Sequence, residues 1–211
     1  MELAKLIVTK ALIRILIFIM FSNFMISCCP KDEIVSYKLT PGDSAFVPYQ
    51  KGQQLTFKHS AGSNVQFTVN GRLKAVDKES GHEEGITFCR KYTYYYYDRE
   101  EIVMLSTNPS IKLQIEIFPK QDTFPPSLRI STLSNIFRLQ NLADACFPHV
   151  EKQCFDSIKL LNHTYYNAIQ ITPDSSNFTP GYLRAKSIIF NKNDGILQIL
   201  MSNNESYTLV K

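Results

Sequence analysis

The sequence lacks the motifs by which the common hydrolases and nucleotide-binding enzymes are identified. It contains no Gly-x-Ser-x-Gly elbow, no His-Glu-x-x-His pair and no glycine-rich phosphate loop. The stretch Gly81-His82-Glu83-Glu84-Gly85 comes nearest to a zinc motif, but it has no second histidine one helical turn later. A polar hairpin tip accounts for these residues. We therefore predict a protein without a catalytic site, a bound metal ion or a cofactor.

A charge excess of one sign is also missing. The chain has 23 Lys and Arg against 19 Asp and Glu, and they are scattered without a basic stripe. Such a charge distribution does not predict binding to nucleic acid. Tryptophan is absent, whereas Phe and Tyr are plentiful, with 14 and 11 copies. This composition is typical of a globular protein, and the length suits one domain.

No apolar run is long enough to span a bilayer. A spanning helix needs about 20 apolar residues, but the run at residues 15–21 is bounded by Arg14 and by the polar pair Ser22-Asn23. Basic residues ahead of a short apolar run are typical of an export signal. We therefore predict a signal peptide at residues 1–27, and a retained transmembrane helix is the weaker alternative.

The end of this leader contains a cysteine in a particular setting. Met25-Ile26-Ser27-Cys28 resembles a bacterial lipobox, in which a small residue directly precedes the cysteine. The resemblance implies that Cys28 becomes the first mature residue, is acylated and holds the protein to a lipid bilayer. Two or more acyl chains anchor a protein stably without a spanning helix. Ordinary secretion, with Cys28 and Cys29 free or oxidised, is the alternative.

A charged triplet follows the predicted lipidation site. Lys31, Asp32 and Glu33 resemble the basic-then-acidic signal that follows the acylated cysteine in surface lipoproteins of the Bacteroidetes phylum. The resemblance implies an export signal and a place in the cell envelope, anchored to the outer membrane and exposed at the cell surface. A solvated linker without a signal is the alternative reading.

Four further cysteines would remain beside an acylated Cys28, and four allow three full pairings. Cys146 and Cys154 lie close in sequence, and we take them as the candidate disulfide. His149 and His163 lie nearby, so a zinc site is an alternative. The spacing is not a standard zinc spacing, however, and oxidation accounts for the same cysteines.

Alternating polar and apolar residues predict β strands through the mature chain. Residues 54–58 and 65–69 alternate on either side of a turn, which predicts a hairpin, and Asn70-Gly71 is expected to end its second strand. In the run at residues 111–118, the apolar side chains are expected to be buried and Lys112, Gln114 and Glu116 to stay in water. Three strands are predicted at the end of the chain, at residues 185–190, 196–201 and 206–210.

These patterns define the fold class. No amphipathic helix of three or more turns is predicted, so we expect an all-β protein: an antiparallel sandwich or barrel-like single domain that ends in a three-strand meander. The predicted organisation is a lipoprotein signal peptide at residues 1–27, a flexible tether at 28–45 and an antiparallel β domain at 46–211. Residues 124–161 have no clear pattern.

Two phrases at the ends of this β domain carry a further resemblance. Phe46-Val47-Pro48-Tyr49, with the hairpin that follows it, is similar to the opening of many Bacteroidetes-type surface lipoproteins that have no assigned activity. Asp194-Gly195-Ile196-Leu197 and Tyr207-Thr208-Leu209 are similar to their endings. The resemblance implies a shared architecture and surface location, and it implies no activity.

The candidate ligand contacts come from an unusual run of tyrosines. In a strand, Tyr92, Tyr94 and Tyr96 share one face, and Tyr95 and Tyr97 share the other. A tyrosine has a flat apolar body and a polar tip, which suits contact with a glycan or a peptide. Packing within a half-buried strand is the alternative role.

Taken together, the sequence favours a membrane-anchored, non-catalytic envelope lipoprotein that acts as a ligand-binding module. Its expected partners are the lipid bilayer, reached through acylated Cys28, and a glycan, a peptide or an envelope protein. A structural or accessory subunit of an envelope complex is the alternative. An enzyme, such as a hydrolase without a recognisable motif, is the third reading.

Overall fold

The computed structural model describes residues 10, 12–20, 31–86, 89–122, 124–132, 135–140, 152–173 and 184–211. These residues belong to two compact units. The smaller unit comprises Met1–Ser36 and Lys78–Tyr96, and the larger unit comprises Tyr37–Asp77 and Tyr97–Lys211. Within the described residues, no helix has both the length and the apolar character needed to cross a membrane.

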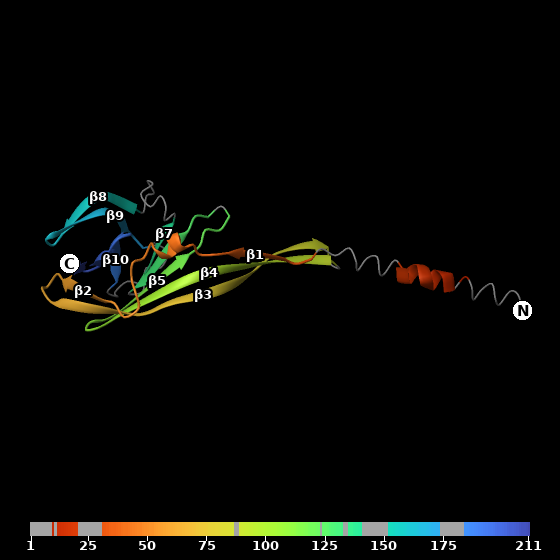
Figure 1. Cartoon of the computed structure of the whole chain (residues 1–211), viewed down its shortest axis with the longest axis horizontal. Helices are drawn as coiled ribbons and strands as arrows, with labels where there is room; N and C mark the ends of the chain where they lie inside the picture. The colour runs from red at the N-terminus through yellow and green to blue at the C-terminus, as the bar shows by residue number, and fades with distance from the viewer. Residues whose placement is uncertain are drawn as a thin grey trace, which may run out of the picture. The chain divides into compact units, whose positions relative to one another are not determined.

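The fold is all-β, as the alternating patterns predicted (Figure 1). The strands are β1 Glu33–Tyr37, β2 Gln54–His59, β3 Asn64–Ile86, β4 Cys89–Thr107, β5 Ser110–Phe118, β6 Ser127–Thr132, β7 Asn135–Gln140, β8 Lys152–Leu160, β9 His163–Ile171, β10 Ala185–Asn191, β11 Gly195–Met201 and β12 Ser206–Leu209. One short helix, α2 Pro41–Ser44, lies between β1 and β2. The predicted three-strand meander at the end of the chain is confirmed, because β10 pairs with β11 and β11 with β12, both antiparallel.

The strands form one strongly curled antiparallel sheet, a half-barrel. Its path is β7-β6-β5-β4-β3-β2-β12-β11-β10-β9-β8. The curl brings distant strands of this path together. Asn135 on β7 donates a hydrogen bond to the carbonyl of Ala185 on β10 at 2.5 Å, and Phe137 bridges to Pro173 after β9. The inner face of the curl is therefore the core.

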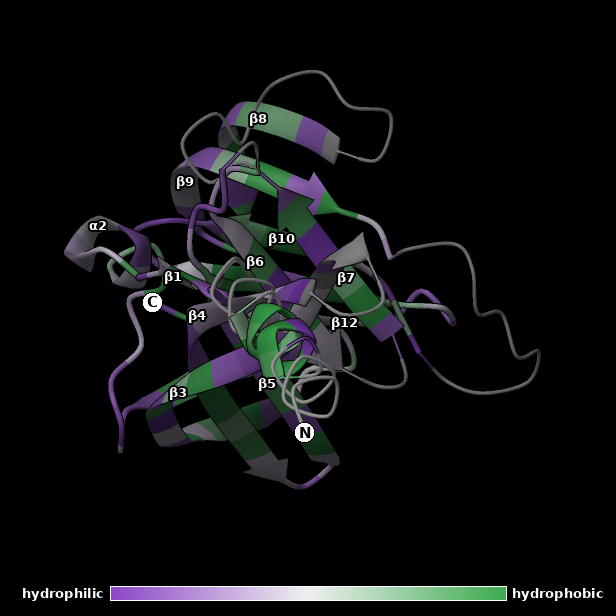
Figure 2. Cartoon of the chain, turned by 90° about the vertical axis from the view of Figure 1, so that its right-hand side faces the viewer, coloured by the Kyte–Doolittle hydropathy of each residue, from purple (hydrophilic) through white to green (hydrophobic). Residues whose placement is uncertain are grey.

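Alternation along β5 shows how the core is built. Hydrophilic and hydrophobic residues alternate along several of the strands drawn in Figure 2. Ile111, Leu113, Ile115 and Ile117 are all buried, as predicted. On the other face Lys112 is exposed, also as predicted. Glu116 was predicted to stay in water, and this is wrong, because the side chain is only 4% exposed. Two arginines, Arg99 and Arg129, cover it and supply its hydrogen bonds.

The first hairpin is confirmed, but its second strand is longer than predicted. β2 pairs with β3 antiparallel, from Gln54 opposite Thr68 to Lys58 opposite Asn64. Asn70-Gly71 does not end β3, which continues to Ile86. Val69 is buried in the core, and Arg72, three positions later, reaches the segment that packs on the same face, so the alternation shifts between them, at Asn70-Gly71. Glycine within a strand commonly marks such a shift.

The predicted tether at residues 28–45 contains two regular elements. β1 pairs with β4 outside the main strand path. It can do so because β5 pairs with β4 only along Glu100–Thr107, which leaves an edge of the preceding part of β4 open. α2 is a single turn whose N-cap, Thr40, forms a capping box with Asp43. Both elements are too short to give a periodic sequence pattern.

The segment Ser44–Tyr49 packs into the inner face of the larger unit. Phe46 stacks on Phe190 of β10 with ring centroids 5.9 Å apart. Tyr49 is fully buried, and its hydroxyl accepts a hydrogen bond from the main-chain N–H of Ile196 at 2.6 Å. Burial raises the pKa of Tyr49 well above its ordinary value, so the hydroxyl stays neutral. The phrase that resembles a lipoprotein opening is thus part of the core.

Arg72 on β3 holds this segment by its main chain. The guanidinium donates to the carbonyls of Ser44, Val47 and Tyr49 at 2.6–3.1 Å. It also forms a two-pronged ion pair with Glu100 on β4, at 2.9 and 3.1 Å. Glu100 is 3% exposed and lies opposite Ile117 on the core side of the sheet. One arginine therefore satisfies a buried carboxylate and three loop carbonyls.

Gly195 provides a test of this core packing. Its φ of +78° favours glycine, and a Cβ there would collide with the hydroxyl end of Tyr49. We predict that Gly195→Ala lowers the free energy of unfolding by about 3 kcal/mol, from backbone strain and overpacking together. Gly62→Ala is the matched control, because Gly62 has a φ of +97° with nothing near the added carbon.

Gly62→Ala should lose only the contribution of backbone strain, about 1 kcal/mol of the free energy of unfolding. Urea denaturation of both variants measures the difference. Equal losses for the two variants would contradict the close approach of Tyr49 to Gly195.

Candidate functional site

Tyr92, Tyr94 and Tyr96 form a row on one face of β4 in the smaller unit, here called the tyrosine face. The rings of Tyr92 and Tyr94 stack with centroids 6.3 Å apart and 24° between their planes. The ammonium group of Lys78 on β3 lies 4.5 Å from the ring centroid of Tyr94 and 5.6 Å from that of Tyr96. Tyr92 is 36% exposed, and the other two are half-buried. The face is an aromatic surface that solvent reaches, with a cation lying on it.

The other tyrosines of the run have different surroundings. Tyr95 packs over Gly81 of β3, where an added Cβ would collide with its ring and with the carbonyl of Thr93. A glycine in a strand commonly permits such an approach of an aromatic ring to the backbone. Tyr97 belongs to the larger unit and is half-buried. The five candidate contacts therefore do not form one surface, and the tyrosine face retains three of them.

The predicted export triplet is held against β4. The carboxylate of Asp32 accepts a hydrogen bond from the main-chain N–H of Tyr92 at 3.1 Å. Glu33 forms an ion pair with Lys91 at 2.6 Å. Lys31 is exposed. Two acids of the triplet thus fix the start of β1 beside the tyrosine face, a role that the sequence analysis did not foresee.

The structure describes the predicted cysteine sites only in part. Cys28 and Cys146 lie outside the described residues. Cys154 on β8 is disulfide-bonded, and its partner is not among the side chains that the structure describes. His163, part of the alternative zinc site, packs edge-on against Tyr165 at 4.7 Å. Among the described residues, no group of three or more His, Cys, Asp and Glu could hold a metal ion.

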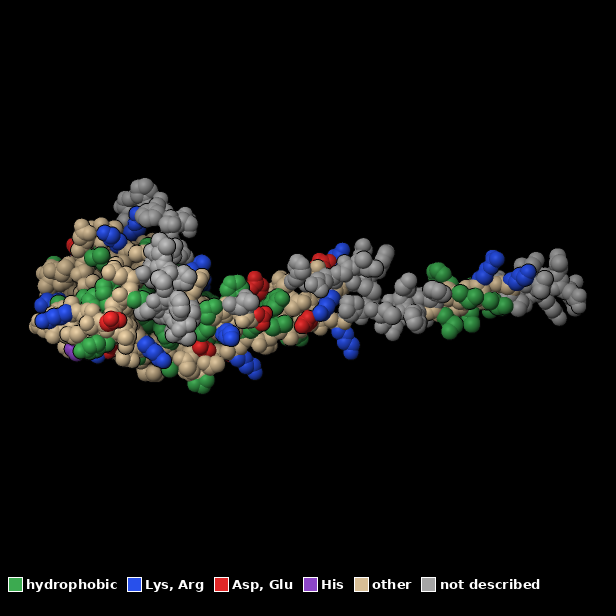
Figure 3. Space-filling view, turned by 90° about the horizontal axis from the view of Figure 1, so that it is seen from above, with side chains coloured by type: hydrophobic (Ala, Val, Ile, Leu, Met, Phe, Trp, Pro, Cys, Tyr) green, Lys and Arg blue, Asp and Glu red, His purple; other side chains and the backbone are tan. Residues whose placement is uncertain are grey.

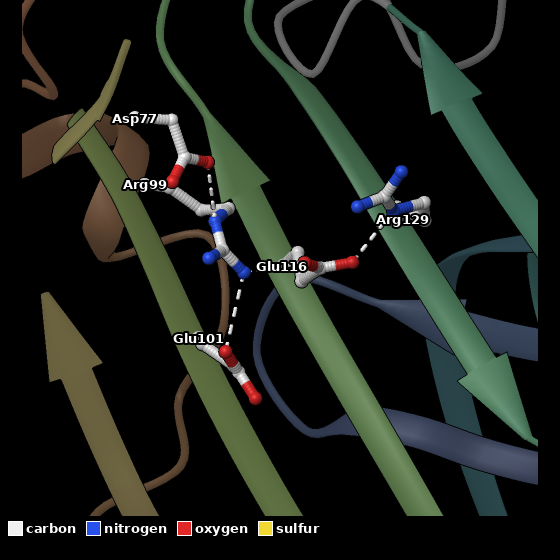
Figure 4. Close-up of polar contacts among 5 residues, drawn as sticks. All are labelled: Asp77, Arg99, Glu101, Glu116 and Arg129. Carbon is white, nitrogen blue, oxygen red and sulfur yellow. Dashed lines mark hydrogen bonds and ion pairs between the residues drawn. The ribbon is translucent and has the colours of Figure 1, made fainter. Parts of the chain in front are cut away.

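A row of five charged side chains lies on β3–β6 of the larger unit (Figure 4). Arg99 donates to Asp77 at 2.7 Å, to Glu101 at 3.2 Å and to Glu116 at 2.6 Å. Arg129 donates to the second oxygen of Glu116 at 2.6 Å. Glu116 therefore bridges two arginines, and each charge in the row lies beside an opposite one.

The electrostatics of this row favour a structural role. Burial by itself would raise the pKa of Glu116, but the hydrogen bonds and charges of Arg129 and Arg99 outweigh it and hold the pKa below its ordinary value. The same balance, with Arg72 as the partner, lowers the pKa of Glu100. A general acid or base works best with a pKa near the working pH. At neutral pH these carboxylates are instead ionised partners of arginine.

The sequence analysis missed this row, although a signal for it exists. Glu116 and Arg129 each lie between buried isoleucine or leucine residues on neighbouring strands. Opposite charges at such positions pair when the strands align, and Glu116 lies directly opposite Arg129 in the β5–β6 register. The register itself could not be derived from the sequence.

Basic and acidic side chains are interspersed on the surface drawn in Figure 3.

Comparison with known proteins adds no assignment. No family model, no curated protein and no solved structure matches this chain. The functional argument therefore depends on the geometry of the residues described above.

The buried carboxylate Glu116 leads to a pH prediction. Because its pKa is lowered in the folded state, its contribution to stability is present above the ordinary value of 4.5 and is lost as the pH falls through the folded-state pKa. We predict that Glu116→Gln lowers the free energy of unfolding at pH 7 by about 2 kcal/mol, less than for a fully buried pair because both arginines are partly exposed. Glu101→Gln, at a more exposed carboxylate, is the control and should cost less than about 1 kcal/mol.

Urea denaturation at a series of pH values measures both effects. The stability difference between the wild type and Glu116→Gln should shrink as the pH drops below 4.5. A difference that stays constant down to strongly acid pH would show that Glu116 contributes no charge interaction.

Proposed function

We propose that this chain is a membrane-anchored, non-catalytic envelope lipoprotein whose tyrosine face contacts a ligand. The observation that carries the proposal is the row of Tyr92, Tyr94 and Tyr96 with Lys78 lying on it. Such a surface offers flat apolar rings, hydroxyl groups and a cation at one place. Tyrosine combines a large contact area with a polar tip, a combination that recurs at binding surfaces.

The anchor in this proposal is Cys28. Its support is the lipobox-like Met25-Ile26-Ser27-Cys28 at the end of the leader and the acidic pair Asp32 and Glu33 shortly after it. An acylated Cys28 would place the protein in the cell envelope, on the outer membrane and facing the cell surface. The bilayer is then its first partner, and a glycan, a peptide or an envelope protein is its second.

The absence of catalysis in this proposal has its own support. The buried carboxylates Glu100 and Glu116 are both paired with arginine, and their pKa values are lowered. Neither carboxylate has the near-neutral pKa that a general acid or base needs.

The parent protein for the test is the mature chain with Cys28→Ser, which removes the predicted lipidation site. Two tyrosine variants of this parent are compared with it. A panel of immobilised glycans is the probe. Tyr92, Tyr94 and Tyr96 are replaced together by Ser in one variant. Tyr166, which is 64% exposed on β9, is replaced by Ser in the matched control. With about 1 kcal/mol from each ring, the triple variant should bind about a hundredfold more weakly.

The control variant should bind as the parent does. Circular dichroism of all three proteins checks that the strands are intact. If the parent retains no glycan, or if the triple variant retains it equally well, the tyrosine face is not a glycan-contact surface.

A further inference from the structure

The hydrogen bond from Tyr92 to Asp32 fixes how far the tyrosine face lies from the predicted anchor. Asp32 is four residues after Cys28. A chain of that length spans at most about 14 Å even when fully extended. Asp32 accepts its hydrogen bond from the main-chain N–H of Tyr92 at 3.1 Å. The main chain of Tyr92 therefore lies within about 20 Å of Cys28, whatever path residues 28–31 take.

The residues that follow this short connection are held in place on β4. Glu33, the next residue, forms its ion pair with Lys91, and β1 then pairs with β4. The start of β1 is thus attached to β4 at two consecutive residues. An anchor on Cys28 would carry Tyr92 with it, because no long linker separates them.

The two faces of this part of the smaller unit differ in charge. The tyrosine face has Lys78 over its rings, and the side chain of Arg90 hydrogen-bonds that of Tyr92. Arg90 is also paired with Glu83, and on the opposite face Glu33 is paired with Lys91, so these charges offset one another. What distinguishes the two faces is Lys78 on the tyrosine face and the exposed Glu79, next to it in β3, on the opposite face. The tyrosine face is therefore the one that anionic headgroups attract.

The same face has an exposed apolar residue beside its rings. Glu33 reaches Lys91, which lies on the face opposite Tyr92, and successive side chains of a strand alternate. Ile34 therefore projects on the side of the tyrosine face, and it is 67% exposed. Tyrosine is enriched where a protein meets the headgroup layer of a bilayer, and lysine keeps its charge in water while its stem lies along apolar groups.

We infer that the tyrosine face lies against the phospholipid headgroups of the bilayer in which Cys28 is anchored. The inference rests on the proposed anchor. It assigns the tyrosine face to the first of the two proposed partners, the bilayer, so the glycan test above and the lipid test below distinguish the two occupants. The acyl chains hold the smaller unit near the membrane, and Tyr92, Tyr94, Tyr96, Lys78 and Ile34 then turn one of its faces toward the lipid. The lipoprotein is thus oriented as well as tethered.

The absence of tryptophan from the chain makes a direct test available. Tyr94→Trp places a single indole on the tyrosine face and keeps an aromatic ring under Lys78. Glu79→Trp is the matched control, an exposed position of the same unit on the opposite face. Both full-length variants are produced with their leader, purified in the acylated form and placed in vesicles of phosphatidylethanolamine with a minor share of phosphatidylglycerol. Some vesicles contain lipids brominated near the headgroup.

The brominated lipid should quench the emission of Tyr94→Trp at least about twofold more strongly than that of Glu79→Trp, with a blue shift for the former only. Flotation of the vesicles reports the anchor separately. If both variants float and are quenched equally, the orientation is wrong and the anchor stands. If neither variant floats, the anchor fails, and the inference fails with it. Circular dichroism confirms that both variants retain the β structure.

Discussion

The larger unit depends most on the ion pair and the hydrogen bonds that the guanidinium of Arg72 forms. This guanidinium neutralises Glu100 on the core side of the sheet and accounts for three carbonyls of the segment Ser44–Tyr49. This segment puts Phe46 and Tyr49 into the core, where Tyr49 contacts β11 close to the end of the chain. A buried carboxylate and partly buried carbonyls without such a partner would be costly. One side chain thus connects β3, β4 and the packed segment.

The same device, an acid paired with a basic side chain, recurs at other charged positions of the long strands. Glu116 lies between Arg99 and Arg129 on the outer face of the larger unit. In the smaller unit, Glu33 pairs with Lys91 beside the tyrosine face. Lys78, in contrast, lies over the aromatic rings of Tyr94 and Tyr96. The proposed membrane-facing surface follows from this division of the charges.

Much of the fold could be predicted from local patterns, and the site only in part. The alternation at residues 111–118 and the turns of the final meander predicted those strands, because burial of one face imposes a period of two. The burial of Glu116 and the continuation of β3 past Asn70-Gly71 depend on which strands pair, and local patterns do not encode register. Alternation was enough to group Tyr92, Tyr94 and Tyr96. The contact of Asp32 with Tyr92 joins residues 60 positions apart, and no local signal predicts it.

The proposal that the start of the chain is a lipid anchor is central to the functional account, and membrane fractionation of cells expressing Cys28→Ser tests it most directly. Cys29→Ser, one residue away, is the matched comparison. The account predicts that the Cys28 variant leaves the membrane fraction and that the Cys29 variant stays in it. Retention of the Cys28 variant in membranes would contradict the account, because the leader would then hold the protein by other means than acylation.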